Sequence, residues 1–325
     1  MLILFLILFL FSCSPERENI YDPKSKYYKN TGTLLGYVFD NKEIKIKDAE
    51  ITIFGERKKN LLITKTDNNG FFQFVDIPLD SYLISIYKEN YQKLNYYKKI
   101  NNHQIETLYF RLNPLPYLKS CQIRSYYEER YILPESLSFN ITCEIFDENL
   151  KEVYLLLPTN DTFYLNHLRN QIYERTITKE MVNGNFDDLV GKSFLVYLIS
   201  NFSDTLIYET SPLIRIIREL PQQISPINGE ITSFKPTLIF SQPPLYFSYT
   251  YFIKIYYLLN NRFPILCYQD SLIPKEDTVF FIEDSLIDGL YLWRVGIKDE
   301  FGNRALSKEA LFEVIGKKLC WKEKP

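Results

Sequence analysis

Short apolar runs that alternate with polar residues are the feature that most constrains the fold of this chain. Ala49–Ile53 and Tyr82–Ile86 alternate with a period of two, and Leu137–Ile145 repeats the pattern later in the sequence. Successive side chains of a strand point to opposite faces of a sheet, so this alternation predicts half-buried strands. Turn residues such as those of Asp67–Gly70 separate the runs. The pattern predicts an all-β protein made of tandem β-sandwich modules.

The composition is that of a folded chain with little net charge. The 325 residues are 46% hydrophobic and 16% aromatic, and the formal net charge is −2. A chain this apolar can bury enough surface to offset the cost of ordering its backbone. Acidic and basic residues are interspersed, and the densest basic run, Arg57–Lys59, falls in an expected loop. We therefore expect neither nucleic-acid binding nor electrostatic binding to a membrane.

The N-terminal segment predicts the compartment. Leu2–Phe11 is an unbroken apolar run, about half the roughly 20 residues that a membrane-spanning helix needs. Leu10–Cys13 resembles the lipobox of bacterial lipoproteins, in which the cysteine is acylated after the signal peptide is removed. The resemblance implies that residues 1–12 are a signal peptide, that Cys13 is the lipidation site and that residues 13–30 are a tether. The alternative is a buried N-terminal strand in which Cys13 is an ordinary core thiol.

A resemblance to a known family covers residues 31–112. Its motifs, in the order that the family has them, are Gly36–Val38, Asp48–Ile51, Thr66–Phe72, Ile77–Pro78, Tyr82 and Tyr91. This segment resembles the carboxypeptidase regulatory-like domain, which implies a transthyretin-like β-sandwich without peptidase chemistry. Asn90 stands where the family has glycine before the tyrosine, and we expect it in the left-handed conformation that Asn tolerates.

Two further modules are expected after the linker Asn113–Pro116. Strand patterns and turn residues over residues 113–220 predict an immunoglobulin-like sandwich. Within it, Lys179–Val190 fits either a short helix or a long loop. Residues 221–317 resemble a fibronectin type III-like domain in three segments, and residues 318–325 form a charged tail. Those segments are Pro236–Phe240, Leu286–Val295 and Asp299–Asn303.

One strand of the last module has two alternative roles. Tyr291, Trp293, Val295 and Ile297 alternate with residues that include Arg294. The large apolar set predicts a core face, and the alternate set predicts a solvent face. The other interpretation is an exposed sugar-stacking platform built on Trp293.

No pattern in the sequence predicts catalysis, a metal site or a bound cofactor. His103 and His167 are far apart and have no metal-ligand spacing around them, and no nucleophile elbow or phosphate loop occurs. Asp67–Gly70 lacks the alternating oxygen ligands of a calcium loop and is explained by a hairpin turn. We therefore expect a protein that is not an enzyme.

Four cysteines remain after Cys13, and they allow three pairings. They are Cys121, Cys143, Cys267 and Cys320. Cys121 and Cys143 both fall on the apolar faces of neighbouring expected strands. A disulfide between them is one hypothesis, and two buried free thiols are the alternative.

These observations favour a non-catalytic lipoprotein that binds a protein or glycan partner through its β-sandwiches. Ser14 follows the lipobox cysteine, where aspartate would signal retention in the inner membrane, so the outer membrane is expected, facing the periplasm or the surface. The alternative function is a carbohydrate-binding accessory of a polysaccharide-uptake system. A hydrolase with a divergent site is a third interpretation, which would require convergent polar residues in a deep pocket.

Metabolic labelling tests the lipid anchor. A palmitate analogue should label the wild-type protein in a bacterial host and should not label Cys13→Ala, because the acyl chain is attached through that thiol. Equal labelling of the two proteins would contradict the lipobox assignment, and Cys267→Ala serves as a control that should keep the label.

Overall fold

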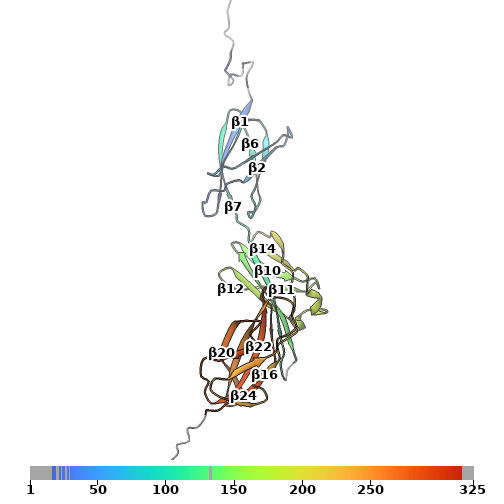
Figure 1. The fold of residues 1–325 in the computed structure, drawn as a ribbon. Coiled ribbons are helices and arrows are strands. Elements are labelled where there is room, and N and C mark those ends of the chain that lie inside the picture. The colour runs from blue at the N-terminus through green and yellow to red at the C-terminus, as the bar shows by residue number, and fades with distance from the viewer. Residues whose placement is uncertain are drawn as a thin grey trace, which may run out of the picture. The chain divides into compact units, whose positions relative to one another are not determined.

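The structure, a computed structural model, describes residues 17–19, 22, 24–25, 28, 30–131 and 134–316. The predicted signal peptide, the lipidation site Cys13, and Cys320 with the tail that contains it lie outside these residues. Strands make up almost all of the regular secondary structure of the described residues, which confirms the predicted all-β sandwich architecture (Figure 1). It forms two compact units that divide between Leu115 and Pro116, and each is described by itself.

The first unit packs a three-stranded sheet against a four-stranded sheet. The first sheet has the order β4-β1-β7, with β1 (Thr31–Asp40), β4 (Phe71–Pro78) and β7 (Ile105–Leu112). The second has the order β3-β2-β5-β6, with β2 (Glu50–Gly55), β3 (Leu61–Lys65), β5 (Ser81–Tyr87) and β6 (Leu94–Lys99).

Strict alternation along the strands builds the core of this unit. Every second residue of β1 is buried, including Leu34 and Val38. Ile51 of β2 and Ile84 of β5 face them from the other sheet and belong to the same hydrophobic cluster. Burying such side chains contributes about 25 cal/mol for each Å² of apolar surface removed from water. The period-two pattern in the sequence is therefore the pattern of the core.

The turn at Asp67–Gly70 does not form the expected hairpin. The strands before and after it, β3 and β4, belong to different sheets, so the turn carries the chain across the sandwich. The Asp67 carboxylate accepts the backbone N–H of Asn69 at 2.7 Å and of Phe71 at 2.9 Å. Gly70 has φ +69°, and a Cβ there would lie 2.5 Å from the carbonyl oxygen of Val38. The turn is thus fixed by internal hydrogen bonds and a close backbone approach.

The first half of the second unit contains two sheets and two short 3-10 helices. Strands β8 and β9 pair with each other, and β13 and β12 extend them; they span Tyr117–Glu128, Ser136–Phe146, Ile172–Thr178 and Asn166–Arg169. The other sheet has the order β11-β10-β14-β15, with bounds Thr162–Tyr164, Leu150–Leu156, Leu195–Ser200 and Thr205–Glu209. The segment left open as helix or loop contains η1 (Lys179–Met181) and η2 (Phe186–Leu189), each a single turn.

The second half of this unit adds nine strands. A small sheet has the order β16-β18-β21, with bounds Gln223–Ser225, Thr237–Phe240 and Val279–Phe281. The long strands are β19 (Tyr249–Leu259), β20 (Phe263–Pro274) and β22 (Gly289–Asp299). The short strands β17 (Glu230–Thr232), β23 (Arg304–Leu306) and β24 (Ala310–Val314) complete the unit.

One sheet of ten strands runs through both halves of the second unit. The link is β23, which pairs with β22 on one side and in parallel with β8 on the other. The buried residues of both halves also form one continuous hydrophobic cluster. Independent folding of residues 113–220 and 221–317 stays a prediction, but in the structure the two segments share a sheet and a core.

The strand β22 confirms the predicted core face and corrects the opposite one. Tyr291, Trp293, Val295 and Ile297 are all at most 2% exposed, and the Trp293 indole donates a hydrogen bond to the carbonyl oxygen of Pro226 at 2.7 Å. The face predicted to meet solvent is also covered, since Arg294 is 5% exposed. Glu128 compensates the positive charge of Arg294 and accepts a hydrogen bond from it, because a buried cation needs an anionic partner.

Emptying the Trp293 site should destabilise the second unit strongly. Trp293→Ala removes a fully buried aromatic ring, and we expect a loss of about 3–5 kcal/mol in the free energy of unfolding. Trp293→Phe keeps most of the packing but leaves the Pro226 carbonyl without its donor, so a smaller loss is expected. Denaturant titration of the three proteins measures both values. An alanine variant as stable as the wild type would be incompatible with the core role of Trp293.

Candidate functional site

A buried polar network fixes the turn between β22 and β23. Asn303 donates to the Asp299 carboxylate at 2.9 Å, and its backbone N–H donates to the same group at 2.8 Å. The Asn303 side-chain oxygen accepts the backbone N–H of Ser125 on β8 at 2.8 Å. The Ser125 hydroxyl in turn donates to the carbonyl oxygen of Arg215 at 2.7 Å. The side chains of Asp299, Asn303 and Ser125 are all hydrogen-bonded, so they fix the turn against β8.

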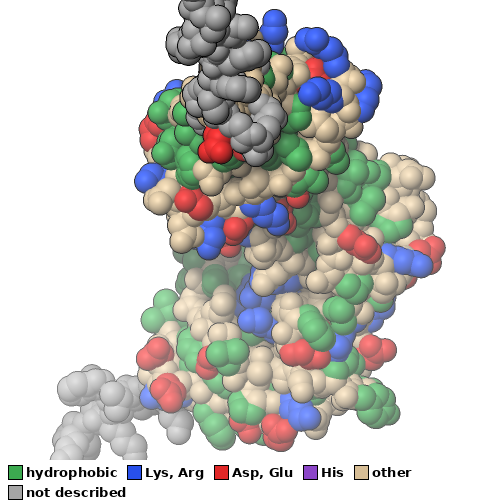
Figure 2. Space-filling model, turned by 90° about the horizontal axis from the view of Figure 1, so that it is seen from above, with side chains coloured by type: hydrophobic (Ala, Val, Ile, Leu, Met, Phe, Trp, Pro, Cys, Tyr) green, Lys and Arg blue, Asp and Glu red, His purple; other side chains and the backbone are tan. Residues whose placement is uncertain are grey.

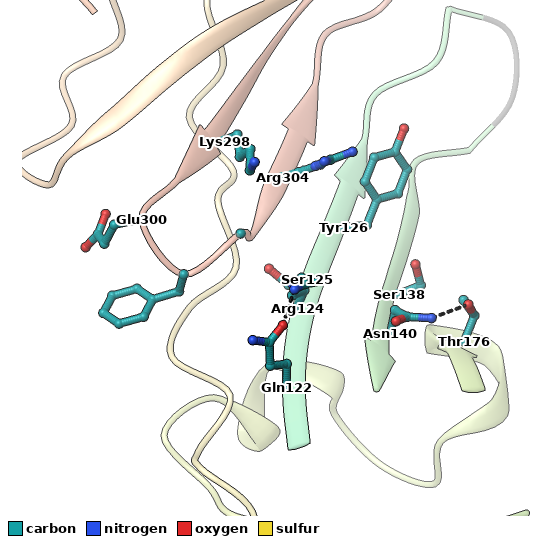
Figure 3. Close-up of a pocket in the computed structure, with 12 residues that line it drawn as sticks. Gln122, Arg124, Ser125, Tyr126, Ser138, Asn140, Thr176, Lys298, Glu300 and Arg304 are labelled. Atoms are coloured by element: carbon teal, nitrogen blue, oxygen red, sulfur yellow. Dashed lines mark hydrogen bonds between the residues drawn. The ribbon is translucent and has the colours of Figure 1, made fainter. Parts of the chain in front are cut away.

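A groove lies beside this turn, on the face of the ten-stranded sheet (Figure 3). Its volume is about 660 Å³, which is in the range of natural ligand sites. The lining comes from β8, β9, β13, β22, β23 and the turn between the last two. It comprises Gln122, Arg124, Ser125, Tyr126, Ser138, Asn140, Thr176, Lys298, Glu300, Phe301, Gly302 and Arg304.

Strand register arranges the lining in rows. Lys298 lies opposite Arg304, Arg304 opposite Tyr126, and Tyr126 opposite Ser138, so one row crosses four strands. The parallel pairing of β23 with β8 is what brings the Arg304 guanidinium toward the Tyr126 ring (Figure 3).

A second row lies beside the first, where Arg124 is opposite Asn140 and Asn140 is opposite Thr176. Asn140 donates to the Thr176 hydroxyl at 3.2 Å, and Arg124 donates to Gln122. The groove therefore presents an aromatic ring, amides, hydroxyls and cations in fixed positions on one rigid sheet.

The cations of the groove outnumber the carboxylates. Within the part of the chain that the structure describes, Arg124, Lys298 and Arg304 form no ion pair. The one carboxylate of the lining, Glu300, lies 3.2 Å from Arg215 outside the groove. Like charges directly opposite on neighbouring strands destabilise a sheet, which applies to Lys298 and Arg304. This part of the sheet thus has uncompensated positive charge.

The pKa of a further lysine on the same sheet face, Lys254, is affected by this positive charge. Burial lowers the pKa of Lys254 on β19, and the nearby Arg294 and Arg304 lower it further, while Glu128 raises it. The sign follows from electrostatics, because positive neighbours disfavour the protonated ammonium. Arg294 itself is neutralised by Glu128 and by Glu309, which lies 3.4 Å away.

Two rows of aromatic rings on outer sheet faces are the other candidate surfaces. In the first unit, Tyr37 lies 5.2 Å from Phe71 and 5.6 Å from Tyr109, which is 70% exposed. In the second unit, Tyr154 stacks on Tyr197 at 4.8 Å on the outer face of the four-stranded sheet β11-β10-β14-β15. Cross-strand aromatic pairs of this kind stabilise a sheet whether or not they bind anything. On the face drawn in Figure 2, hydrophobic side chains lie among acidic and basic ones.

Sequence patterns did not reveal the groove, because its cations are far apart in the chain. Arg124 and Arg304 come from strands in different halves of the second unit, so no basic stripe appears in the sequence. The useful signal was the alternation in β22 and β8, which assigns Lys298 and Tyr126 to the faces away from the core. The two histidines lie outside the groove lining.

The structure brings together the cysteine pair that the sequence singled out. Cys121 of β8 and Cys143 of β9 are register partners, and their Sγ atoms are 3.0 Å apart as free thiols. The neighbouring thiol and burial both raise the pKa of Cys143, so the thiolate is disfavoured. The disulfide between them stays a prediction, and Cys267 on β20 is exposed and separate.

Two further structural findings concern membranes and metals. None of the helices in the described ranges has the length and hydropathy needed to span a membrane. Within those ranges no three His, Cys, Asp or Glu side chains lie together as a metal site would require.

No protein-family model matches the chain, and no curated protein matches it. Among solved structures, the chain is similar to BcpA, the major pilin subunit of Bacillus cereus, with 11% identity, 84% of this chain and 91% of that chain covered, and a TM-score of 0.37. It is also similar to a Bacteroides uniformis protein described as carbohydrate binding, with 12% identity, 55% and 99% coverage, and a TM-score of 0.25. A streptococcal ancillary pilin has 12% identity, 59% and 62% coverage, and a TM-score of 0.26. These likenesses are too weak to assign a function.

Oxidation tests the cysteine pair. Two thiols exchange with oxidised glutathione to give one protein disulfide and two molecules of reduced glutathione. We expect this treatment to join Cys121 to Cys143 and to lower the mass of the peptide pair by two hydrogen atoms. Alkylation followed by peptide mapping measures this, with Cys267 blocked beforehand. If both cysteines are still fully alkylated after unfolding of the oxidised protein, the free-thiol alternative holds.

Proposed function

We propose that this chain is a non-catalytic, lipid-anchored bacterial surface or periplasmic protein that binds a glycan in the groove of its second unit. The observation that carries the proposal is the lining itself. Tyr126 provides an aromatic face, and Gln122, Asn140 and Thr176 provide the amides and hydroxyl that hydrogen-bond to sugar hydroxyls. The ring and these polar groups are held in register on the sheet, so the site is preorganised.

The groove favours binding over hydrolysis. A glycosidase uses two carboxyl groups placed on either side of the scissile bond. The lining contains one carboxylate, Glu300, and Arg215 pairs with it at 3.2 Å. Beneath the groove β8 pairs with β9 along its length and with β23 at Tyr126–Glu128, so most backbone groups are used in strand pairing and side chains make most of the contacts.

The other parts of the chain have supporting roles in this proposal. Cys13 would carry the acyl chains, with the outer membrane as the destination. The first unit would be a carboxypeptidase regulatory-like module that acts as a scaffold; in its support, it has seven strands in two sheets, and Asn90 has the expected left-handed φ of 64°. Residues 221–317 would be the fibronectin type III-like part. A polysaccharide-uptake system is the specific setting in which such a glycan-binding accessory would act.

Affinity electrophoresis through gels that contain different polysaccharides tests glycan binding. We expect at least one polysaccharide to retard the full chain, and Tyr126→Ala to weaken that binding about tenfold or more, since it removes the aromatic face. Tyr126→Phe should bind almost as well as the wild type. The matched control is Tyr164→Ala, a change of the same kind at a 59% exposed tyrosine of the same unit outside the groove.

The control also decides between surfaces. The ring centroids of Tyr164 and Tyr154 are 5.9 Å apart, so Tyr164 belongs to the aromatic row of the four-stranded sheet. If Tyr164→Ala abolished retardation while Tyr126→Ala left it intact, the groove would not be the binding site. If no polysaccharide retarded the wild type, the glycan proposal would fail. Melting of each variant shows whether it is folded.

A further inference from the structure

We infer that the groove binds an acidic glycan, one whose carboxylate or sulfate groups neutralise Lys298, Arg304 and Arg124. This inference rests on the proposed function and adds the chemical class of the ligand. Arg304 and Arg124 are exposed, Lys298 is half-buried, and all three line the same hollow. No described carboxylate lies within ion-pair distance of any of these three cations. By contrast, the buried Arg294 on the same sheet face has two carboxylate partners, Glu128 and Glu309.

Lys298 and Arg304 are placed where their like charges repel each other. They are direct register partners on β22 and β23, where two like charges destabilise the sheet. Other cations close to the turn between these strands are placed beside acids: Arg215 lies 3.5 Å from Asp299, and Arg218 lies 2.8 Å from Asp187. An uncompensated pair retained in a groove is the expected arrangement where a bound anion completes the charge balance.

The geometry fits an acidic sugar better than a lone anion. Arg304 extends toward Tyr126, so a sugar ring on the aromatic face would place its acidic substituent at the guanidinium (Figure 3). Arginine binds planar carboxylates and tetrahedral oxyanions such as sulfate through two parallel hydrogen bonds. Asn140 and Thr176 lie in the neighbouring row and can bind the hydroxyls of an adjacent sugar.

The experiment compares ligands that share a polymer backbone and differ in whether it carries acidic groups. Polygalacturonate and its methyl ester share one backbone, and dextran sulfate and dextran share another. We expect the full chain to bind each acidic polymer at least tenfold more tightly than its neutral counterpart, and to lose affinity as salt is raised. Polyglutamate and single-stranded DNA are included as anions without sugar acids, and we expect them to bind more weakly than both acidic polysaccharides.

The variants remove charge and keep a polar, unbranched side chain. Lys298→Gln combined with Arg304→Gln should weaken binding of polygalacturonate at least tenfold and flatten its salt dependence. The control is Lys192→Gln combined with Lys275→Gln, which changes the net charge equally at exposed positions outside the groove and should bind as the wild type does. Because the groove variant removes a like-charge pair, its melting temperature should equal or exceed that of the wild type.

The outcomes separate this inference from the proposed function. Equal binding of acidic and neutral polymers, still sensitive to Tyr126→Ala, would overturn the acidic class and leave glycan binding in place. Equal loss in both double variants would show a nonspecific charge effect and overturn the inference. Tighter binding of polyglutamate or DNA would make the groove a site for another polyanion. Binding of no polymer would refute the proposed function itself.

Discussion

The continuity of the ten-stranded sheet in the second unit depends on one short contact, the parallel pairing of β23 with β8. Three residues of β23 make this ladder, and Asn303 anchors it by bonding to both Asp299 and the backbone of Ser125. The residues of that bond are 178 positions apart in the sequence. Without this pairing β8 and β23 would be edges of separate sheets, and the row from Lys298 to Ser138 would not exist. The groove is therefore a consequence of the ladder that joins the strands of the two halves into one sheet.

The pairing of β23 with β8 buries one cation of this sheet face, Arg294, and leaves Arg304 and Lys298 accessible to water. Arg294 enters the junction and donates hydrogen bonds to the carbonyl oxygens of Ser307 at 2.7 Å and Glu129 at 2.6 Å, besides its pairing with Glu128. A buried guanidinium has to be paired, because an isolated charge in a protein interior is strongly unfavourable. Arg304 is exposed and Lys298 is half-buried, so water reaches both and they have no ion-pair partner in the described protein. Burial thus separates the paired cation of the junction from the unpaired cations of the groove.

The first unit shows a simpler relation between sequence and stability. Its central strands β1 and β5 alternate strictly. Buried acceptors such as Asp80 fix its loops, and Asp80 accepts the backbone N–H groups of Arg57 and Lys58 at 2.9 Å each. These hydrogen bonds lower the pKa of the Asp80 carboxyl, and the one from Lys58 has the largest effect. A depressed carboxyl pKa contributes stability above the unfolded-state value, and that contribution is lost as the pH falls through the folded-state value. The exposed basic run of Arg57–Lys59 is thus anchored through its backbone.

The sequence by itself determined which residues form strands and which face of each strand is apolar. Alternation with period two identified Tyr291, Trp293 and Val295 as core, and the family resemblance, which has glycine at the position of Asn90, indicated a left-handed backbone there. Both properties depend on residues close in the chain. Only the tertiary structure decided which strands pair across long distances, since strand pairing leaves no local mark in a sequence. For that reason the burial of Arg294 and the meeting of Arg304 with Tyr126 could not be read from the chain. Both follow from the pairing of β23 with β8, which sets distant residues side by side.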